Sequence, residues 1–337
     1  MTMPGDAIPA WREARPWLAD AVFCDGLLPW TAEFLPPSAG LPEQLSRFHR
    51  NGCDHISLTV AAGRDGAERA LARYGFLLQE LGRMGSRVQI ASDAATIHQA
   101  KREGKLSVSF HFQSATPFAF DLDLVGSFRQ LGITRAILAY NEGNIFADGC
   151  HELRDAGLSA AGRRLVNRMD EVGMIVDLSH CGERTSFDVL EMSSARPPMF
   201  SHSNARAIYD HERNVSDAQI RAVAQRGGYI GINGVGMFLG ATSSDIPAAM
   251  AQHAAHIASI AGPDRVGLGL DFMFLEGSGY DFFHRARERW PKGYPDPPWD
   301  FLQPEQFGDL VIELENAGFS NTEVIGVLGG NYLRLLV

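Results

Sequence analysis

Cysteine is scarce in this 337-residue sequence, which also lacks long apolar runs and clusters of basic residues. Its four cysteines, Cys24, Cys53, Cys150 and Cys181, form no C-x-x-C pair and no dense framework, which predicts reduced thiols in a cytoplasmic protein. The first 20 residues mix charged residues with prolines and contain no apolar core of a signal peptide. No stretch reaches the apolar length of a spanning helix, so we expect no membrane association.

The formal net charge of −10 disfavours nucleic acid as a partner, because nucleic-acid binding needs clustered Lys and Arg side chains. A local basic pocket for a small anionic substrate remains compatible with this charge. The length suits one α/β barrel with insertions and allows a large core that needs no disulfide or structural metal.

Short apolar or β-branched runs alternate with longer helical patterns, which is typical of parallel βαβ units. Eight runs fit a closed (β/α)8 TIM barrel, and we predict one domain over residues 1–337. A weaker ninth run, Val88–Ile90, is interpreted as an extra piece in the connection before Leu106. The eight predicted strands are Ala21–Leu27, His55–Val60, Leu106–Gln113, Arg135–Asn141, Met174–His180, Pro198–Ser203, Gly228–Asn233 and Val266–Phe272.

Helix boundaries are marked by local signals. Ser216 with Gln219, and Ser320 with Glu323, are typical of capping boxes that begin helices. Gly227 fits a helix stop.

The segment Leu275–Pro304 breaks the alternation. It is too rich in Pro and Gly for a simple helix and too aromatic for a solvated linker. Because it follows the eighth strand, it emerges on the face of the barrel that carries active sites, and we interpret it as a loop insertion that covers the substrate. An insertion packed on the outside of the barrel is the alternative.

Polar side chains collect at the carboxyl ends of the predicted strands, which converge around the axis of a closed barrel. Together they form a candidate site for metal binding or proton transfer. They are Asp25, Gln113, Asn141, His180, His202 and Asp271.

His180 and His202 end consecutive strands, and each follows a serine. Adjacent parallel strands lie about 5 Å apart, so both imidazoles can reach one metal ion. For either histidine alone, a hydrogen-bonded core histidine is an equally good interpretation, whereas the matched pair favours a metal site.

Several motifs resemble the membrane dipeptidase (renal dipeptidase, peptidase M19) family of amidohydrolase-type barrels. They are Asp177–His180 (DLSH), Phe200–Arg206 (FSHSNAR), His211–Asn214 (HERN), Gly227–Gly228, Val266–Phe272 (VGLGLDF) and Gly330–Arg334 (GNYLR). Their order and spacing match the family from about Phe110 to the end of the chain.

The resemblance implies a site with two zinc ions. A His-x-Asp on the first strand holds one ion, a glutamate bridges both, and two histidines, which match His180 and His202, complete the second. It implies that Arg213, followed by Asn214, holds the carboxylate of a small substrate, and that Asp271 meets the substrate amine and assists proton transfer. The family also implies a homodimer.

Three departures from the family pattern reduce the expected metal content. The first strand reads Cys24–Leu28 (CDGLL) and keeps only Asp25 as an ionisable group; Gln113 stands in place of the bridging glutamate, and Asn141 in place of a histidine. A neutral amide does not supply the charge that holds two dications about 4 Å apart. We therefore expect one zinc on His180 and His202, with Asp25, Gln113 or Asp271 as third ligand and Asp25 preferred. The chain resembles a bacterial branch of the family, in which a Tyr-Asn pair and a Gln replace the family's residues.

These residues predict a metal-dependent hydrolase of a dipeptide or small amino-acid-derived amide. Asp271 transfers the proton, Arg213 and Asn214 bind the carboxylate, Asn141 with Tyr140 stabilises the developing oxyanion, and Gln113 orients the water or adds an oxygen ligand. Two alternatives stay open. One is a lyase or isomerase that transfers protons in the same pocket, and the other is a non-catalytic protein that binds a small molecule.

Two further patterns receive a structural interpretation. His253 and His256 share one face of a predicted outer helix, where packed or exposed histidines are the norm. Asp54–His55 lies at the start of a strand, on the face of the barrel that serves stability.

Overall fold

The structure of the chain is a computed structural model, and it describes residues 8–30, 40–192, 194–274, 280–281, 283, 294–296 and 298–336. Its strands form one parallel sheet in the order β1-β2-β4-β5-β6-β7-β8-β9, so successive strands along this path are neighbours in space. Their bounds are β1 Cys24–Leu28, β2 His55–Ala62, β3 Val88–Ile90, β4 Leu106–Gln113, β5 Ile133–Ile137, β6 Ile175–Asp177, β7 Met199–Phe200, β8 Tyr229–Ile232 and β9 Val266–Leu268.

The last strand returns to the first and nearly closes the barrel. Just beyond β9, the Leu270 amide donates to the Asp25 carboxylate (2.8 Å) and the Asp271 amide donates to the Leu27 carbonyl (2.9 Å). A side chain at Gly26 would meet the Leu268 carbonyl at 2.8 Å, so this close approach requires glycine. The predicted (β/α)8 barrel is confirmed.

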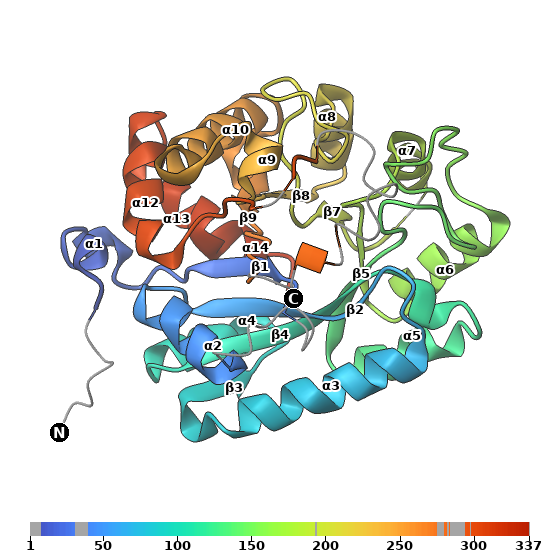
Figure 1. Cartoon of the computed structure of the whole chain (residues 1–337), viewed down its shortest axis with the longest axis horizontal. Coiled ribbons are helices and arrows are strands. Elements are labelled where there is room, and N and C mark those ends of the chain that lie inside the picture. The colour runs from blue at the N-terminus through green and yellow to red at the C-terminus, as the bar shows by residue number, and fades with distance from the viewer. Residues whose placement is uncertain are drawn as a thin grey trace.

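Helices surround the strands (Figure 1). The longer ones are α2 Leu41–Arg50, α3 Ala67–Gly82, α4 Ala94–Arg102, α5 Asp123–Gln130, α6 Ala160–Glu171, α7 Glu183–Glu191, α8 Asp217–Gln225, α10 Ile246–Ala261 and α12 Phe307–Asn316. The short ones are α1 Ala10–Glu13, α9 Gly236–Leu239, α13 Asn321–Ile325 and α14 Asn331–Leu333. No helix of the described residues is long and apolar enough to span a bilayer.

Local signals in the sequence predicted several boundaries correctly. Ser216 and Ser320 both form the predicted capping boxes, and Gly227 follows α8 with a φ of +75°. The extra run Val88–Ile90 is the strand β3, which pairs with the beginning of β4. It adds a strand beside the barrel and does not interrupt the main order of strands.

The strands that carry the candidate site are shorter than predicted. β6 ends at Asp177 and β7 at Phe200, so His180 and His202 lie in the turns that follow. β5 ends at Ile137, four residues before Asn141. The site therefore sits on turns at the mouth of the barrel, positioned by short strands beneath them.

The opposite end of the barrel is held by buried charges. Asp54, just before β2, accepts hydrogen bonds from the Arg12 guanidinium (2.7 Å) and the Lys101 ammonium (3.0 Å). His55 contacts the hydroxyls of Ser107 and Ser109 (2.9 and 3.0 Å). These contacts fit the structural role that the sequence predicts for Asp54–His55.

Candidate active site

Three of the predicted site residues have left-handed backbones. Asn141, His180 and Asp271 have φ values of 61°, 64° and 55°. Such conformations are uncommon for residues other than glycine, although Asn, Asp and His tolerate them better than most. They persist where surrounding contacts hold the backbone, and they concentrate at functional sites. The sharp turns they create set the direction in which each side chain leaves its strand end.

His180 and His202 are joined directly. Their Nε2 atoms lie 2.8 Å apart, His180 Nδ1 lies 2.7 Å from Asn141 Oδ1, and His202 Nδ1 lies 2.7 Å from Ser201 Oγ. The acceptor oxygen of Asn141 requires a proton on His180 Nδ1, so His180 Nε2 accepts from His202 Nε2–H and His202 Nδ1 accepts from the Ser201 hydroxyl. The Tyr140 ring stacks on His180 with ring centroids 4.0 Å apart. One chain of hydrogen bonds therefore fixes the tautomer of both imidazoles.

Both imidazoles are held neutral. Burial lowers the pKa of His180 and of His202 well below 6.5, and the nearby positive charge of Arg213 lowers both further. Neutral imidazole is the form that binds metal ions.

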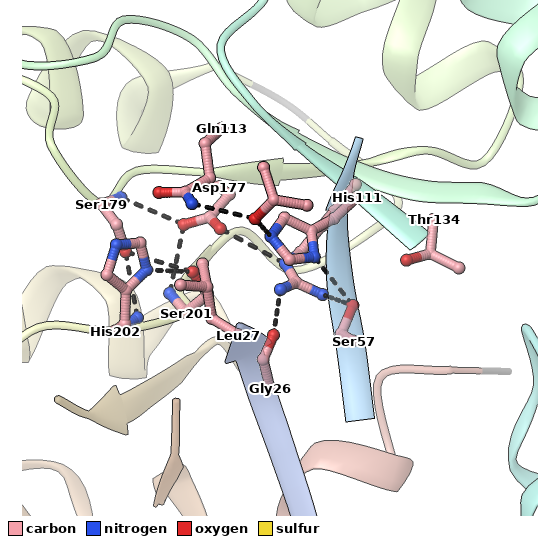
Figure 2. A network of polar contacts seen from close by, with 12 residues as sticks. Gly26, Leu27, Ser57, His111, Gln113, Thr134, Asp177, Ser179, Ser201 and His202 are labelled. Carbon is pink, nitrogen blue, oxygen red and sulfur yellow. Dashed lines mark hydrogen bonds and ion pairs between the residues drawn. The ribbon is translucent and has the colours of Figure 1, made fainter. Parts of the chain in front are cut away.

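A buried ion pair lies deeper in the barrel, beneath the two histidines. Arg135 Nε is 3.3 Å from Asp177 Oδ2, and their side chains are 1% and 0% exposed. Asp177 Oδ1 accepts the backbone amides of Ser179 and Ser201, each at 3.1 Å. These serines precede His180 and His202, so the Asp177 carboxylate bonds both of the turns that carry the histidines (Figure 2).

Hydrogen bonds continue from Arg135 to the far side of the barrel. Arg135 donates to Ser57 Oγ (3.1 Å), and Ser57 Oγ contacts His111 Nδ1 (2.9 Å). His111 Nε2 contacts Thr59 Oγ1 (2.9 Å), which accepts from the Gln113 amide (2.9 Å). The interior of the barrel is thus a polar network that runs from Gln113 to the histidine pair (Figure 2).

Asp271 and Asp25 are buried carboxyl groups with different surroundings. Asp271 Oδ2 accepts from the Asn233 amide (3.0 Å), and burial raises the pKa of Asp271 to about 6 against the opposing effect of Arg213. Asp25 Oδ1 accepts the amides of Leu27 (3.0 Å) and Leu270 (2.8 Å), and burial raises the pKa of Asp25 to about 7. Both groups titrate near neutral pH, as proton-transfer groups do.

Arg213 and Asn214 are buried close to the histidines. Arg213 donates to the His202 carbonyl (3.2 Å), and its guanidinium carbon lies 5.5 Å from the centre of the Phe238 ring. The Asn214 amide group donates to the carbonyls of Tyr209 and Phe238. Among the described residues, Arg213 Nε and Asn214 Oδ1 have no hydrogen-bond partner.

Two cavities meet at His180, the one described residue that lines both. The aromatic cavity has a volume of about 270 Å³, and the polar cavity has a volume of about 260 Å³. The polar cavity is lined by His180 together with Arg213, Asn214, Ser203 and several acidic side chains. The aromatic cavity is lined by His180, Asp271, Gln113, Asn141, Tyr140, Thr59, Met237, Phe238, Met273, Phe283, Tyr294 and Trp299, among others.

The aromatic cavity brings the expected substrate-covering loop to the site. Phe283, Tyr294 and Trp299 belong to that segment, and they line the same cavity as Asp271 and His180. Residues 275–279, 282, 284–293 and 297 lie outside the described residues, and the interpretation of the segment as a cover for the substrate stays a prediction.

Comparison with known proteins identifies the family. The family model described as membrane dipeptidase (peptidase family M19) matches residues 44–282. The chain belongs to the membrane dipeptidase family. It is 35% identical over 216 residues to an uncharacterized dipeptidase of Schizosaccharomyces pombe, covering 63% of this chain and 48% of that protein. It is 31% identical over 252 residues to dipeptidase aclJ of Aspergillus oryzae, covering 73% and 55%. The chain thus spans about half the length of the curated relatives it matches.

Solved structures show the same barrel. An amidohydrolase from Pseudomonas aeruginosa superposes with a TM-score of 0.83 and 27% identity, covering 95% of this chain and 97% of that one. A metallo peptidase from Rhodobacter sphaeroides, liganded with a phosphinate mimic of the dipeptide L-Ala-D-Ala, has a TM-score of 0.77 and 21% identity, covering 94% and 98%. The second similarity concerns the fold alone.

The site of this membrane dipeptidase family member offers two of the ligands that a single metal ion needs. Its described residues do not offer the ligands of a two-metal centre. His180 Nε2 carries no proton, as a metal requires, and His202 Nε2 would become free for an ion once its proton moved to Nδ1, which would then donate to Ser201 Oγ. In the described part of the chain, no group of three or more His, Cys, Asp or Glu side chains is arranged to hold a metal ion. The structure therefore does not bring Asp25 or Asp271 to the histidine pair as a further ligand, and Asp25 as third ligand stays a prediction.

The interior network has a signal in the sequence that the predicted site does not include. Polar residues alternate along β2 (Ser57, Thr59) and β4 (Ser107, Ser109, His111), and alternation in a strand places them on one face. In the closed barrel this face is the interior. His253 and His256, which we expected to be packed or exposed on an outer helix, make structural contacts there. His253 Nδ1 accepts the Ala205 amide (3.0 Å), and His256 pairs with Asp217 (2.8 Å).

The Arg135–Asp177 pair generates a first prediction. Asp177→Asn keeps an oxygen for the Ser179 and Ser201 amides but leaves the Arg135 guanidinium buried without its carboxylate, and we expect a loss of about 3–5 kcal/mol in the free energy of unfolding. Urea unfolding monitored by circular dichroism measures it. The double variant Asp177→Asn with Arg135→Met removes the unpaired charge and should recover part of the loss. Simple additivity of the two single losses would contradict the coupling.

Asp271 generates a prediction about pH. Its pKa of about 6 lies above the 3.8 of the unfolded chain, so the ionised carboxylate costs stability above about pH 6 and the cost disappears as the pH falls below about 4. This rise corresponds to about 3 kcal/mol. Relative to wild type, Asp271→Asn should therefore gain stability, from under about 1 kcal/mol at pH 4 to about 3 kcal/mol at pH 8.

Denaturant melts of both proteins between pH 4 and pH 8 measure this difference. The matched control is Asp123→Asn, since the Asp123 side chain is exposed and its substitution should leave the difference flat. A flat difference for Asp271→Asn as well would show that the Asp271 carboxyl is not held in its protonated form by burial.

Proposed function

We propose that this chain hydrolyses dipeptides or small dipeptide-like amides and uses one divalent metal ion, zinc by the family resemblance. One observation carries the proposal. His180, which contacts His202, lines two cavities; the buried acid Asp271 lines one of them and the buried cation Arg213 lines the other. A dipeptide carries an ammonium group at one end and a carboxylate at the other, and its amide bond lies between them.

His180 and His202 would hold the ion, and Gln113, which lines the aromatic cavity together with His180, would add an oxygen ligand. Such an ion supplies a water of lowered pKa, which is a nucleophile at neutral pH. Two zinc ions are not proposed, because Gln113 replaces the bridging carboxylate and Leu27 and Leu28 leave the first strand without a His-x-Asp.

The chain's own residues bind and orient the substrate. Arg213, whose Nε–H has no partner in the part of the chain that the structure describes, donates to the substrate carboxylate. Asp271 receives the substrate ammonium, and its pKa of about 6 suits it to accept a proton and deliver it to the leaving amine. Asn141 is 3% exposed, its Oδ1 is bound to His180, and its Nδ2 has no partner among the described residues. That amide would donate to the oxygen of the scissile carbonyl as negative charge develops on it.

A proton-transfer enzyme of the lyase or isomerase type is the second candidate. The direct contact between His180 Nε2 and His202 Nε2 favours it, because the two imidazoles already satisfy each other without an ion. In this case Asp271 and the histidine pair act as acid and base.

Metal content separates the two candidates. We expect about one zinc per chain in protein expressed with zinc, and its loss in the His180→Ala/His202→Ala double variant, because both imidazoles are ligands. Elemental analysis of the purified proteins measures it, together with zinc-dependent hydrolysis of a dipeptide panel. The control is His253→Ala, since His253 bonds the Ala205 amide outside the site.

Two zinc ions per chain would contradict the single-ion site. Absence of zinc even after zinc is added in vitro, with chelator-resistant turnover that depends on Asp271, would establish the second candidate in place of the hydrolase.

A further inference from the structure

The two cavities that meet at His180 differ in chemistry, and this difference selects among substrates. The inference rests on the proposed function, in which Asp271 meets the amino end of the substrate and Arg213 meets its carboxylate. Asp271 lines the aromatic cavity and Arg213 lines the polar cavity. Volumes of about 270 and 260 Å³ lie just below the usual range of ligand pockets, so each cavity holds one residue of the substrate.

The aromatic cavity offers the ring surfaces of several aromatic side chains. Trp299 Nε1 donates to the Pro295 carbonyl (2.9 Å), and the Trp299 ring packs against Phe283 (centroids 4.4 Å) and Tyr294 (6.3 Å). Phe238 packs against Tyr294 at 5.7 Å. Two methionines, Met237 and Met273, complete the apolar lining. Such a wall binds an apolar or aromatic side chain, because burying apolar surface against it is favourable in free energy.

Charged residues at the aromatic cavity neutralise each other. Arg73 pairs with Asp65, and Arg64 pairs with Glu142 at 3.1 Å. Asp271 remains as the charge that meets the substrate ammonium. Among the described residues of this cavity, the side chain next to that ammonium therefore finds no further unpaired charge.

The polar cavity has the opposite character. Ser203 Oγ and Asn214 Oδ1 are unpartnered in the described chain, and both residues are 2% exposed. Carboxylates outnumber guanidinium groups along its wall, with Arg206 already 3.5 Å from Glu183. Besides Arg206 and Arg213, the charged residues are Glu152, Asp155, Glu183, Asp210 and Glu212. This wall accepts hydrogen bonds from a polar or positively charged side chain, and an apolar side chain would leave its buried polar atoms unsatisfied.

We propose that the enzyme selects dipeptides with an apolar or aromatic residue on the amino side and a polar or positively charged residue on the carboxyl side. The selection arises from the two walls that meet at His180. It is a property of both cavities together, so reversing the order of the same two residues must reverse the fit.

Pairs of dipeptides with the same composition and reversed order test the proposal. Zinc-supplied wild-type protein is assayed with Phe-Lys against Lys-Phe, and with Leu-Ser against Ser-Leu. We expect kcat/KM to favour Phe-Lys and Leu-Ser by about ten-fold or more, the size of discrimination that one side-chain pocket supplies. Equal or reversed preference in both pairs overturns the proposal while the hydrolase function stands. No turnover of any dipeptide overturns both.

Two variants test whether the substrate preference comes from the lining of the aromatic cavity and of the polar cavity. Phe283→Ala should lower kcat/KM for Phe-Lys several-fold, whereas the control Phe120→Ala, whose side chain is 97% exposed, should not. Glu152→Gln removes one negative charge and keeps the oxygen that accepts the Gly143 amide, so it should lower kcat/KM for Phe-Lys a few-fold and leave Phe-Ser unchanged. An equal loss on both substrates would place the effect in the fold and overturn the assignment to the polar cavity.

Discussion

The ion pair between Arg135 and Asp177 is the interaction on which the interior of this barrel depends. A guanidinium that is 1% exposed is stable only when its donors are bound, and Arg135 reaches the Asp177 carboxylate, the Gly26 carbonyl, and the hydroxyls of Ser57 and Tyr332. These partners come from β1, β2, β6 and α14. One side chain thus connects strands on opposite sides of the barrel and joins them to the last helix.

The active-site geometry follows from this buried charge. Asp177 is fixed by Arg135 on one oxygen and binds the amides of Ser179 and Ser201 with the other, so the two histidine-bearing turns keep one spacing. β6 and β7 share a single register pair, Asp177 with Met199, which would not hold those turns by itself. The carboxylate supplies the connection that the short strands lack.

How far the sequence could predict this structure depended on the range of each interaction. Strand positions, the capping boxes at Ser216 and Ser320, and the closeness of His180 to His202 follow from local pattern and the spacing of parallel strands. Arg135 was placed correctly in a strand, but its partners lie 42 to 197 residues away, and nothing local marks an arginine as interior. The environment of Asp25 was unpredictable for the same reason, because its Leu270 partner is 245 residues distant.

The three departures from the family pattern are consistent with one another once the network is seen. Gln113 donates its amide to Thr59 Oγ1, a contact that an ionised glutamate has no proton to make. Asn141 accepts the proton of His180 Nδ1 and so leaves Nε2 of that ring facing His202. The backbone of Leu27 serves the closure of the barrel through Asp25 and Asp271. Each of these residues bonds a neighbour, so the three departures form one consistent hydrogen-bonded arrangement.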